Sequence, residues 1–577
     1  MNAAISAVTS GEKSMSMYYR GWLPLLLLLS AGAAQAGSIE GAVSVAGKPM
    51  AGAMVGLTDG RGVTESVYTD ATGHYRLDTD LHGALKLRVR KRYHKDEVRD
   101  VTLQAAAAQK LDFSLAPLTD ARELSDDHPS LSHFALIDFD KDEKAPFSRA
   151  NFTRDCLSCH SIGNLTTRWP RPPEGWVPTV QRMHGYLGNA DMALIRQRAE
   201  RLSQALDGKL VSSRPEIPYD ALLAQATIHE FRLPNTVVPH DAEYSPTYDK
   251  VYLSEMFAGE VLETDLKTGQ TQHFKLPDDG EKAGGEFTRR GLPAPYGLTI
   301  ARAPHSLAEG PDGKFYLTDS IGAAITVFDP RSRKMQSFAV GGGALYPHTV
   351  RAGKDGIVWF TIAMSNQVGR FDPTSGTTKV ITLPPTPSLS ASGGPIPYGI
   401  DLSPRDGSVW YSKLASDKIG RIDPVSLEVK EFDSPVRGPR RQRFDAQGQL
   451  WVTGFSEGAI ARIDIETWKA EIFPVPRYAP NEIPAPYALA IHPVTQEVWV
   501  NDTMLDVAWR FLPGEKRFVA YPMPLKGTYT RDFSFTPQGW ACTANNPIPA
   551  TALEGGVPEL ICIDPGHSPA AVAVSAR

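Results

Sequence analysis

Short segments of alternating apolar and polar residues recur from about residue 226 to the end of the chain. Each repeat has an aromatic anchor in a strand-like segment: Tyr252, Tyr316, Trp359, Trp410, Trp451, Trp499 and Trp540. An aspartate stands 13 residues after each of the first five anchors: Asp265, Asp329, Asp372, Asp423 and Asp464. Fixed offsets within repeats, with variable spacing between them, predict rigid four-stranded sheets joined by loops of different length. A β-pattern with a period of about 40–50 residues is typical of a propeller, so the seven anchors predict a seven-bladed β-propeller over residues 226–577.

The strand that closes the ring of blades is predicted at the start of the repeat region, before the first blade. Residues 228–234 resemble an outer strand with no blade before it, so they can complete the last blade and remove its free edge. The tail segment 571–574 is the alternative. The last repeat is stretched, and Cys542 and Cys562 flank the insertion. In an oxidising compartment we expect these two cysteines to form a disulfide; the alternative is a pair of buried thiols.

The N-terminal segment has the pattern of a secretory signal. Lys13 and Arg20 precede one apolar run, which starts at Trp22 and gives way to small residues up to Ala36. A basic start, an apolar stretch of about a dozen residues and an Ala-x-Ala end predict a signal peptide over residues 1–36. The run is shorter than the roughly 20 residues that span a bilayer, and the alternative is a buried N-terminal helix. We therefore expect a periplasmic or otherwise exported protein with no transmembrane segment in the mature chain.

Residues 37–117 form a second β-rich region, in which short alternating strands are separated by glycine-containing turns. The pieces that carry a family resemblance are Gly41-x-Val43, Gly47–Pro49, Gly52–Ala53, Gly73–Tyr75 and Tyr93. They resemble the carboxypeptidase regulatory-like domain, which implies a small β-sandwich with an accessory role. Residues 118–144 are rich in aspartate, and we expect them to be a solvated linker.

Composition narrows the function classes. Of the 577 residues 42% are hydrophobic, so the chain can fill several globular cores, and wholesale disorder is excluded. The formal net charge of -5 and the lack of a basic stripe in the sequence argue against nucleic-acid binding. Four cysteines are too few for a disulfide-framework protein, and two of them lie in a motif of their own.

The segment Cys156–Leu157–Ser158–Cys159–His160 is the strongest chemical signal in the chain. Two thiols at this spacing can add across the two vinyl groups of a haem, and the adjacent histidine then reaches the iron. A redox dithiol and half of a zinc site are the alternatives. The histidine and the predicted export favour one covalent haem c, attached at Cys156 and Cys159 and ligated by His160.

A second iron ligand is expected on the helix that follows the motif. Helices are predicted over residues 175–183 and 191–206. This arrangement resembles minimal c-type cytochrome domains, in which a tryptophan-containing helix carries the distal methionine. The resemblance implies a small α-helical cytochrome domain over residues 145–225, with Met183 as the second haem-iron ligand, and a thioether raises the reduction potential relative to a second histidine. His184 and Met192 are the competing candidates.

The innermost strand of each blade is expected to begin at residues that point toward the propeller axis. At the equivalent place in the seven repeats stand His240, His305, His348, Tyr398, Arg440, Tyr487 and Tyr529. Three adjacent blades thus present an arc of imidazoles, faced by tyrosine and arginine. Imidazoles can ligate a divalent or transition metal, or one can act as acid or base beside a carboxylate such as Asp319. We predict His240, His305 and His348 as catalytic residues; the alternative is a structural role.

Two repeats, Trp359–Asp372 and Trp410–Asp423, resemble those of virginiamycin B (streptogramin B) lyase. The resemblance implies the propeller fold and a site in which a ring histidine works with magnesium held by glutamates. This chain departs from that pattern at the strand ends. Glu255 is the glutamate that survives there, and the two repeats closest to the family have Ile362 and Lys413 at the equivalent positions.

These features predict a mainly β protein: a seven-bladed propeller with an N-terminal β-sandwich and a small α-helical cytochrome c domain. The favoured hypothesis is an exported haem oxidoreductase, whose propeller binds a small-molecule substrate while the haem exchanges electrons with a soluble or membrane-bound partner. A lyase that uses His305 or His348 as a base is the second hypothesis, and a non-catalytic electron-transfer or binding protein is the third. The first is favoured because a lyase needs no electron carrier, and a pure carrier needs no propeller with an asymmetric ring of ionisable residues.

Overall fold

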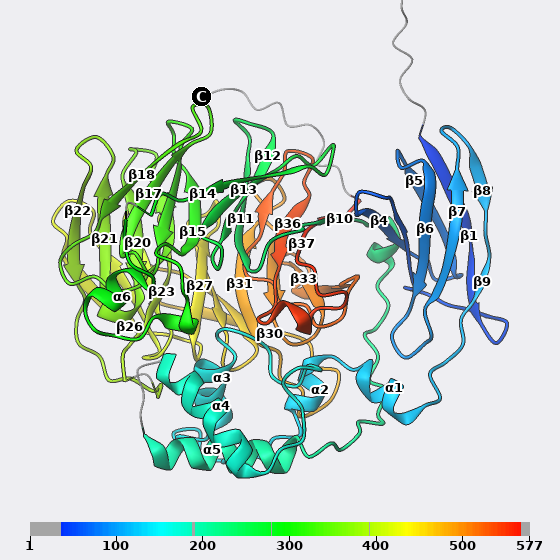
Figure 1. Cartoon of the computed structure of the whole chain (residues 1–577), viewed down its shortest axis with the longest axis horizontal. Helices are drawn as coiled ribbons and strands as arrows, with labels where there is room; N and C mark the ends of the chain where they lie inside the picture. Colours follow the sequence, from blue (N-terminus) through cyan, green and yellow to red (C-terminus); the bar gives the residue numbers. More distant parts are fainter. Residues whose placement is uncertain (1–35, 187–190, 279, 392, 567–577) are drawn as a thin grey trace, which may run out of the picture.

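The computed structural model describes residues 36–186, 191–278, 280–391 and 393–566. The chain is mainly β and has three parts: an N-terminal β-sandwich, a layer of helices, and a large array of four-stranded antiparallel sheets (Figure 1). All but the last residue of the predicted signal peptide, and the whole alternative closing segment 571–574, lie outside the described residues. Within the described ranges, no helix is long and apolar enough to cross a membrane.

Six of the sheets consist of four strands that are consecutive in sequence. The first three sheets are β11 (Pro239–Ser245), β12 (Lys250–Glu255), β13 (Glu260–Thr264), β14 (Thr271–Lys275); β15 (Pro304–Glu309), β16 (Phe315–Asp319), β17 (Ala324–Asp329), β18 (Lys334–Ala339); and β19 (Pro347–Ala352), β20 (Val358–Ile362), β21 (Gln367–Asp372), β22 (Thr377–Thr382). The next three are β23 (Pro397–Leu402), β24 (Val409–Lys413), β25 (Lys418–Ile422), β26 (Val429–Asp433); β27 (Pro439–Phe444), β28 (Leu450–Gly454), β29 (Ala459–Ile463), β30 (Ala470–Pro474); and β31 (Pro486–Ile491), β32 (Val498–Asp502), β33 (Val507–Leu512), β34 (Arg517–Pro522). The first six aromatic anchors each lie buried in the second strand of one sheet, and the first strands of neighbouring sheets contact one another. The four-stranded repeat predicted from the pattern is confirmed.

The remaining large sheet joins the last repeat to the β-sandwich. Its strand order is β35 (Ser534–Phe535), β36 (Ala541–Asn545), β37 (Glu559–Asp564), β10 (Thr227–Arg232), β4 (Val63–Tyr68), β3 (Met54–Thr58), β6 (Gly83–Arg90), β7 (Glu97–Leu103). The prediction that residues 228–234 add a strand to the last repeat is confirmed, because β10 pairs antiparallel with β37. The other edge of β10 pairs antiparallel with β4, which the sequence pattern did not predict. Pairing on both sides leaves neither β10 nor β37 with an open edge.

The second sheet of the sandwich is shorter. It contains β1 (Gly37–Val45), β2 (Lys48–Pro49), β5 (His74–Thr79), β8 (Ala108–Lys110) and β9 (Phe113–Ser114). Ile39 on β1 and Leu87 on β6 are fully buried in the core between the two sheets. Strands β5 and β6 alternate more and less buried side chains, β5 along its whole length, which is the pattern expected of a sheet with one covered face.

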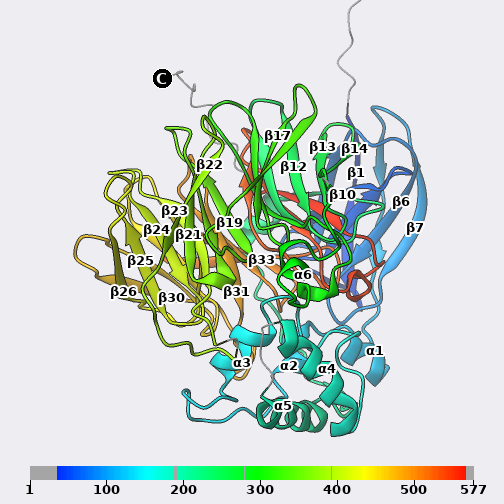
Figure 2. The same cartoon turned by 60° about the vertical axis from the view of Figure 1, so that its left-hand side comes forward.

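The helices form a layer across one end of the sheet array (Figures 1 and 2). They are α1 (Ala121–Asp126), α2 (Ser130–Phe134), α3 (Arg149–Cys156), α4 (Pro173–Tyr186) and α5 (Met192–Ala205), with a short turn of 3-10 helix at Ala221–Gln225. The two helices predicted after the cysteine motif are confirmed by α4 and α5. Phe152 of α3 and Trp176 of α4 share one apolar core with Trp451, Tyr487 and Trp509 of the sheets. The helical layer and the sheets are therefore packed as one body.

The prediction of a solvated linker over residues 118–144 is wrong. Leu131 and Phe134 of α2 are fully buried in the core shared with the sheets. The aspartates that suggested solvation have fixed partners: Asp120 caps α1, and Asp127 accepts the backbone N–H of Tyr93 and pairs with Lys526. Because these carboxylates cap a helix and bind neighbouring parts of the chain, the apolar residues between them can pack inward.

Candidate functional site

The three predicted histidines lie side by side at the start of neighbouring innermost strands. His240 is on β11, His305 on β15 and His348 on β19, each directly after a proline. In all three strands the register shifts just after this point, which is the mark of a β-bulge. A bulge re-aims the side chain of the residue that it contains. The ring centres of adjacent histidines are 3.9 Å apart, and Tyr398 continues the series 3.9 Å from His348.

Hydroxyl groups on the second strands hold this arc in place. Ser254 on β12 donates to the carbonyl of His305 over 2.8 Å, and Thr318 on β16 donates to the carbonyl of His348. Thr361 makes the same bond to the carbonyl of Tyr398 in the next sheet. Each hydroxyl therefore links one sheet to the ring residue of the next. These hydroxyl residues were not predicted from the sequence, although a Ser or Thr stands two positions after the aromatic anchor in each of the first five repeats.

The imidazoles are buried and held neutral. Burial, together with the nearby Arg531 guanidinium, lowers the pKa of His240 to about 3. Burial also places the pKa values of His305 and His348 well below the ordinary histidine value, helped by the neighbouring rings at His305 and by the Arg441 guanidinium at His348. His240 Nδ1 lies 2.9 Å from Oδ1 of Asp241, and His348 Nδ1 lies 2.9 Å from the hydroxyl of Thr349. Neutral rings with one nitrogen occupied can offer the other to a bound molecule.

Asp319 is not the carboxylate beside the histidines. It accepts the backbone N–H groups of Ala303 and Gly322 and pairs with Arg302, so it supports a loop. Asp241 takes the place that was predicted for Asp319, since it follows His240 directly and contacts its ring. The sequence signal was this adjacency, a carboxylate next to a ring histidine.

Glu255 also has a structural role. Its carboxylate accepts the backbone N–H groups of Val237, Val238 and Ala258. At the equivalent position Lys413 pairs with Glu431 over 2.6 Å. Across the described ranges, no group of three or more His, Cys, Asp and Glu side chains is arranged to hold a metal ion.

The side of the ring that faces the histidines is occupied by the cysteine motif. Tyr529 donates to the carbonyl of Leu157 over 2.7 Å, Arg440 donates to the hydroxyl and carbonyl of Ser158, and Arg531 donates to the carbonyl of Cys159. Two of these three residues, Tyr529 and Arg440, stand at predicted ring positions. Together with Arg531 they hold the Leu157–Cys159 backbone over the ring. The sheets therefore position the cysteine motif directly.

All the predicted haem-binding residues line one cavity of about 370 Å³. Cys156 comes from the end of α3, Cys159 and His160 from the loop after it, and Met183 from α4. Cys156 and Cys159 are not bonded to each other, and burial raises the pKa of the Cys156 thiol to about 12. His160 Nδ1 lies 2.9 Å from the carbonyl oxygen of Ser161, which places the ring proton on Nδ1 and leaves the Nε2 lone pair for a ligand.

The competing candidates for the second ligand differ from Met183 in their surroundings. His184 lines the same cavity, but its Nε2 lies 2.9 Å from the Nη1 donor of Arg198. Arg198 is buried and paired with Asp155 over 2.5 Å, so it is held in place. Met192 is packed against the apolar core and is not in the cavity wall. This geometry favours Met183.

A second cavity of about 350 Å³ lies over the histidine arc and shares a wall with the first. Both are lined by Cys159, Tyr186, Tyr296 and Ile548. Cys159 Sγ is 3.3 Å from the Tyr296 hydroxyl, which is 3.5 Å from the Tyr346 hydroxyl, and Tyr346 packs against His305 and His348. The cysteine motif and the histidine arc are thus separated by one layer of side chains.

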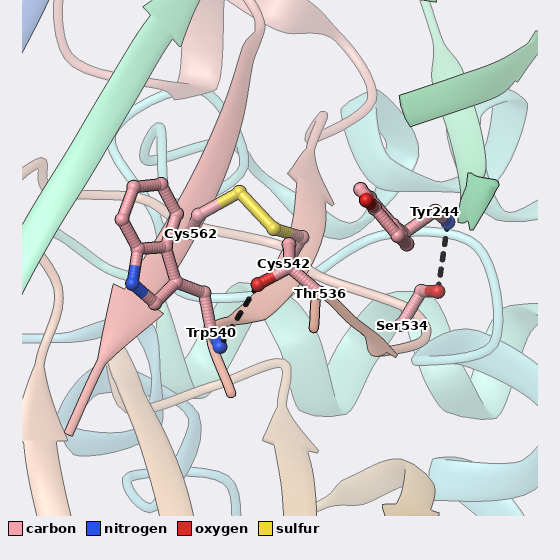
Figure 3. The surroundings of a disulfide bond; sticks show 6 residues. All are labelled: Tyr244, Ser534, Thr536, Trp540, Cys542 and Cys562. Atoms are coloured by element: carbon pink, nitrogen blue, oxygen red, sulfur yellow. Dashed lines mark hydrogen bonds between the residues drawn. A yellow bond between two sulfur atoms is a disulfide. The ribbon is translucent and has the colours of Figure 1, made fainter. Parts of the chain in front are cut away.

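The predicted disulfide is confirmed. Cys542 on β36 and Cys562 on β37 are directly opposite in register and bonded to each other (Figure 3). Close by, the hydroxyl of Ser534 accepts the backbone N–H of Tyr244 over 2.8 Å, which joins β35 to β11. The disulfide therefore joins β36 to β37, in the sheet that lies next to β11, the strand that carries His240.

The comparisons agree with the β-architecture. Residues 263–511 match the virginiamycin B lyase family. The repeats thus form a lyase-like propeller. Residues 38–116 match the carboxypeptidase regulatory-like domain, as predicted for the N-terminal sandwich.

The solved structures that match part of this chain are less than 20% identical to it. Virginiamycin B lyase from Staphylococcus aureus, with selenomethionine, is 18% identical over 59% of this chain and 99% of its own, with a TM-score of 0.46. A streptogramin B lyase structure is also 18% identical, over 59% and 98%, with a TM-score of 0.47. Hydrazine synthase from Kuenenia stuttgartiensis is 17% identical over 42% and 73%, with a TM-score of 0.35. No curated protein matches the chain.

Proposed function

We propose that the protein is an exported c-type haem oxidoreductase built on a seven-bladed propeller, with β35, β36, β37 and β10 as the seventh blade. In this proposal the helical layer binds one haem covalently, and the cavity over the histidines binds a small-molecule substrate. The observation that supports it most strongly is the wall, containing Cys159 and Tyr296, that the two cavities share. A haem in the first cavity would border directly on a substrate in the second.

The chain's own residues suit a haem at this place. Attachment needs two separate thiols, which Cys156 and Cys159 supply, and an imidazole with a free Nε2, which His160 supplies. Haem iron provides one-electron chemistry when it is bound. Met183 would be the second ligand, and Arg198 keeps the neighbouring His184 in a hydrogen bond. A largely apolar cavity with a few polar groups is typical of cofactor sites.

The propeller would bind and orient the substrate and manage its proton. His305 and His348 present neutral rings that can hold a substrate hydroxyl by a hydrogen bond. His240 would accept the proton that a substrate loses on oxidation, because the carboxylate of Asp241 can stabilise the resulting imidazolium. The helical layer, which covers the ring, would keep bulk water from this step.

A carbon–oxygen lyase is the second candidate, and the match of residues 263–511 to the virginiamycin B lyase family favours it. Two observations weigh against it. The carboxylate of Glu255 is occupied by three backbone N–H groups. The equivalent positions of two other repeats hold Ile362 and the ion-paired Lys413, so they offer no carboxylate for a metal ion. Nor does a lyase account for a cavity lined by two free thiols and an adjacent histidine. The oxidoreductase is therefore our first choice.

The haem proposal is tested by expressing the full chain in a host that exports and matures c-type cytochromes. We expect one covalent haem per chain in the pyridine haemochrome spectrum, and its complete loss in the double variant Cys156→Ser/Cys159→Ser. Met183→Ala should abolish the weak near-infrared sulfur–iron band and lower the reduction potential, because a thioether ligand raises it.

Met192→Ala is the matched control and should leave both the band and the potential unchanged, since Met192 is packed in the core. An exported, folded protein without covalent haem would contradict the proposal. If Met192→Ala, rather than Met183→Ala, removed the band, the ligand assignment would be wrong while the haem assignment stood.

A further inference from the structure

One buried charge faces the substrate cavity without a carboxylate partner. Arg531 is 1% exposed and lines the cavity over the histidines. Its hydrogen bonds go to two neutral carbonyls, those of Asn546 and Cys159, and its guanidinium lies 4.5 Å from the ring centre of Tyr529. Among the described residues no carboxylate forms an ion pair with it. A buried cation without a counter-charge costs several kcal/mol, so this site is built to receive an anion.

Two other buried arginines of the ring, Arg440 and Arg441, have different surroundings. Arg441 forms ion pairs with Asp241 over 2.9 Å and with Asp532 over 2.7 Å. Arg440 packs on the ring of Tyr487 at 3.7 Å and lowers the pKa of that buried phenol against the effect of burial. Neither arginine lines the cavity. Of these three arginines, Arg531 is thus the one that lines the cavity, and no carboxylate of the described residues forms an ion pair with it.

The rest of the cavity wall is largely apolar and aromatic, which suits an apolar ring. Met256, Phe287 and Ile396 form part of its wall, and the three imidazoles are neutral. A volume of about 350 Å³ accommodates a single substituted ring. Imidazole nitrogens on one side of such a ring could bind a hydroxyl group, while Arg531, next to His240, binds an acidic group.

We propose that the cavity binds a small aromatic carboxylate, with the carboxylate on Arg531 and the ring beside His240, His305 and His348. This inference rests on the proposed function, because it names the substrate class of the same site. A guanidinium can bind a carboxylate through two parallel hydrogen bonds, and the buried position strengthens them. The carboxylate on Arg531 could come from a substrate or from a propionate group of the haem. The experiment must therefore distinguish these two sources of carboxylate.

The test is calorimetric titration of the full haem-loaded chain with benzoate, and with benzamide as the neutral analogue of the same shape. We expect benzoate to bind at least about 30-fold more tightly than benzamide, as for a buried charge pair that loses one partner. Arg531→Gln should weaken benzoate binding by a similar factor and leave benzamide unchanged. Arg531→Lys keeps the charge and should recover part of the affinity.

Arg443→Gln is the matched control, because Arg443 is an ion-paired arginine on an inner strand that does not line the cavity. It should bind benzoate as the parent does. Equal binding of benzoate and benzamide, no binding of either, or unchanged benzoate binding by a folded Arg531→Gln variant would overturn the inference. So would benzoate binding only after haem loss in Cys156→Ser/Cys159→Ser, because a propionate would then be the anion on Arg531. Haem content is measured in every sample, so a chain that binds benzoate but lacks haem would refute only the oxidoreductase proposal.

Discussion

Single buried carboxylates show how strongly position controls charge in this protein. Glu230 on β10 is 4% exposed, and burial raises its pKa to about 7. Glu559 on β37, on the same face of the sheet, has a raised pKa for the same reason and because Glu230 is nearby. Glu554, close to both, pairs with Arg90 over 2.6 Å, which outweighs burial and lowers its pKa to about 2. Neighbouring glutamates at the joint between the sandwich and the propeller thus have pKa values shifted in opposite directions.

These shifts predict opposite effects of neutral substitutions on stability. Glu230 binds its proton more tightly in the folded chain than in the unfolded one, so its contribution is present at low pH and is lost as pH rises from about 4.5 to 7. Glu230→Gln should therefore raise the melting temperature at pH 8 and make no difference near pH 4. Glu554→Gln should lower it at pH 8, because an ion pair is lost. Calorimetric melts of both variants across this pH range check the signs, and a Glu230→Gln variant that is less stable than the parent at pH 8 would contradict the assignment.

Among the elements, β10 has the most unusual position. Its sequence resembles an outer propeller strand, and it does pair with β37. It also pairs with β4, so this single strand joins the β-sandwich and the last repeat into one continuous sheet. The neighbouring pair β36–β37 is tied by the disulfide. The end of the sheet array is therefore secured by a covalent bond on one side of β37 and by strand pairing on the other.

The disulfide is expected to stabilise this joint. Cys542 and Cys562 are 20 residues apart, and closing a loop of that size lowers the entropy of the unfolded chain by an amount worth about 3 kcal/mol. Cys542→Ser/Cys562→Ser should melt at a lower temperature than the parent, and a reductant should lower the melting temperature of the parent but not that of the variant. Equal melting of parent and variant without reductant would show that the bond constrains nothing.

At the scale of the whole molecule, the helical layer completes the propeller. Tyr529, Arg440 and Arg531 bind the backbone of the cysteine motif, and apolar residues of α3 and α4 share a core with the sheets. Removing the helices would expose apolar side chains of the core that the helices and the sheets share. Exposed apolar surface of this kind causes aggregation.

Residues 226–577 expressed alone are therefore expected to be insoluble or to melt well below the full chain. Loss of β4 adds an open edge at β10, which also promotes association. Size-exclusion chromatography and thermal melts compare this fragment with the full chain. A monomeric fragment as stable as the full chain would show that the helices and the sandwich are independent of the propeller.

Local patterning was enough to predict the repeated four-stranded sheets, the N-terminal sandwich, the two helices after the cysteine motif and the disulfide. These features depend on periodic burial and on spacing within one repeat, which the chain displays directly. The equivalence of His240, His305 and His348 follows from the same periodicity. Their function, like the haem, remains a prediction.

Contacts between distant segments could not be inferred in this way. Strand β10 pairs with β4, which lies far from it in the sequence. The cysteine motif is bound by Tyr529, Arg440 and Arg531, which are equally distant in the sequence. That Asp241, and not Asp319, contacts a ring histidine depends on the orientation of one side chain. A polar residue at a ring position looks the same in the sequence whether it faces a cavity or binds a backbone carbonyl. The difference depends on which segment packs against it, and that packing is a property of the folded chain.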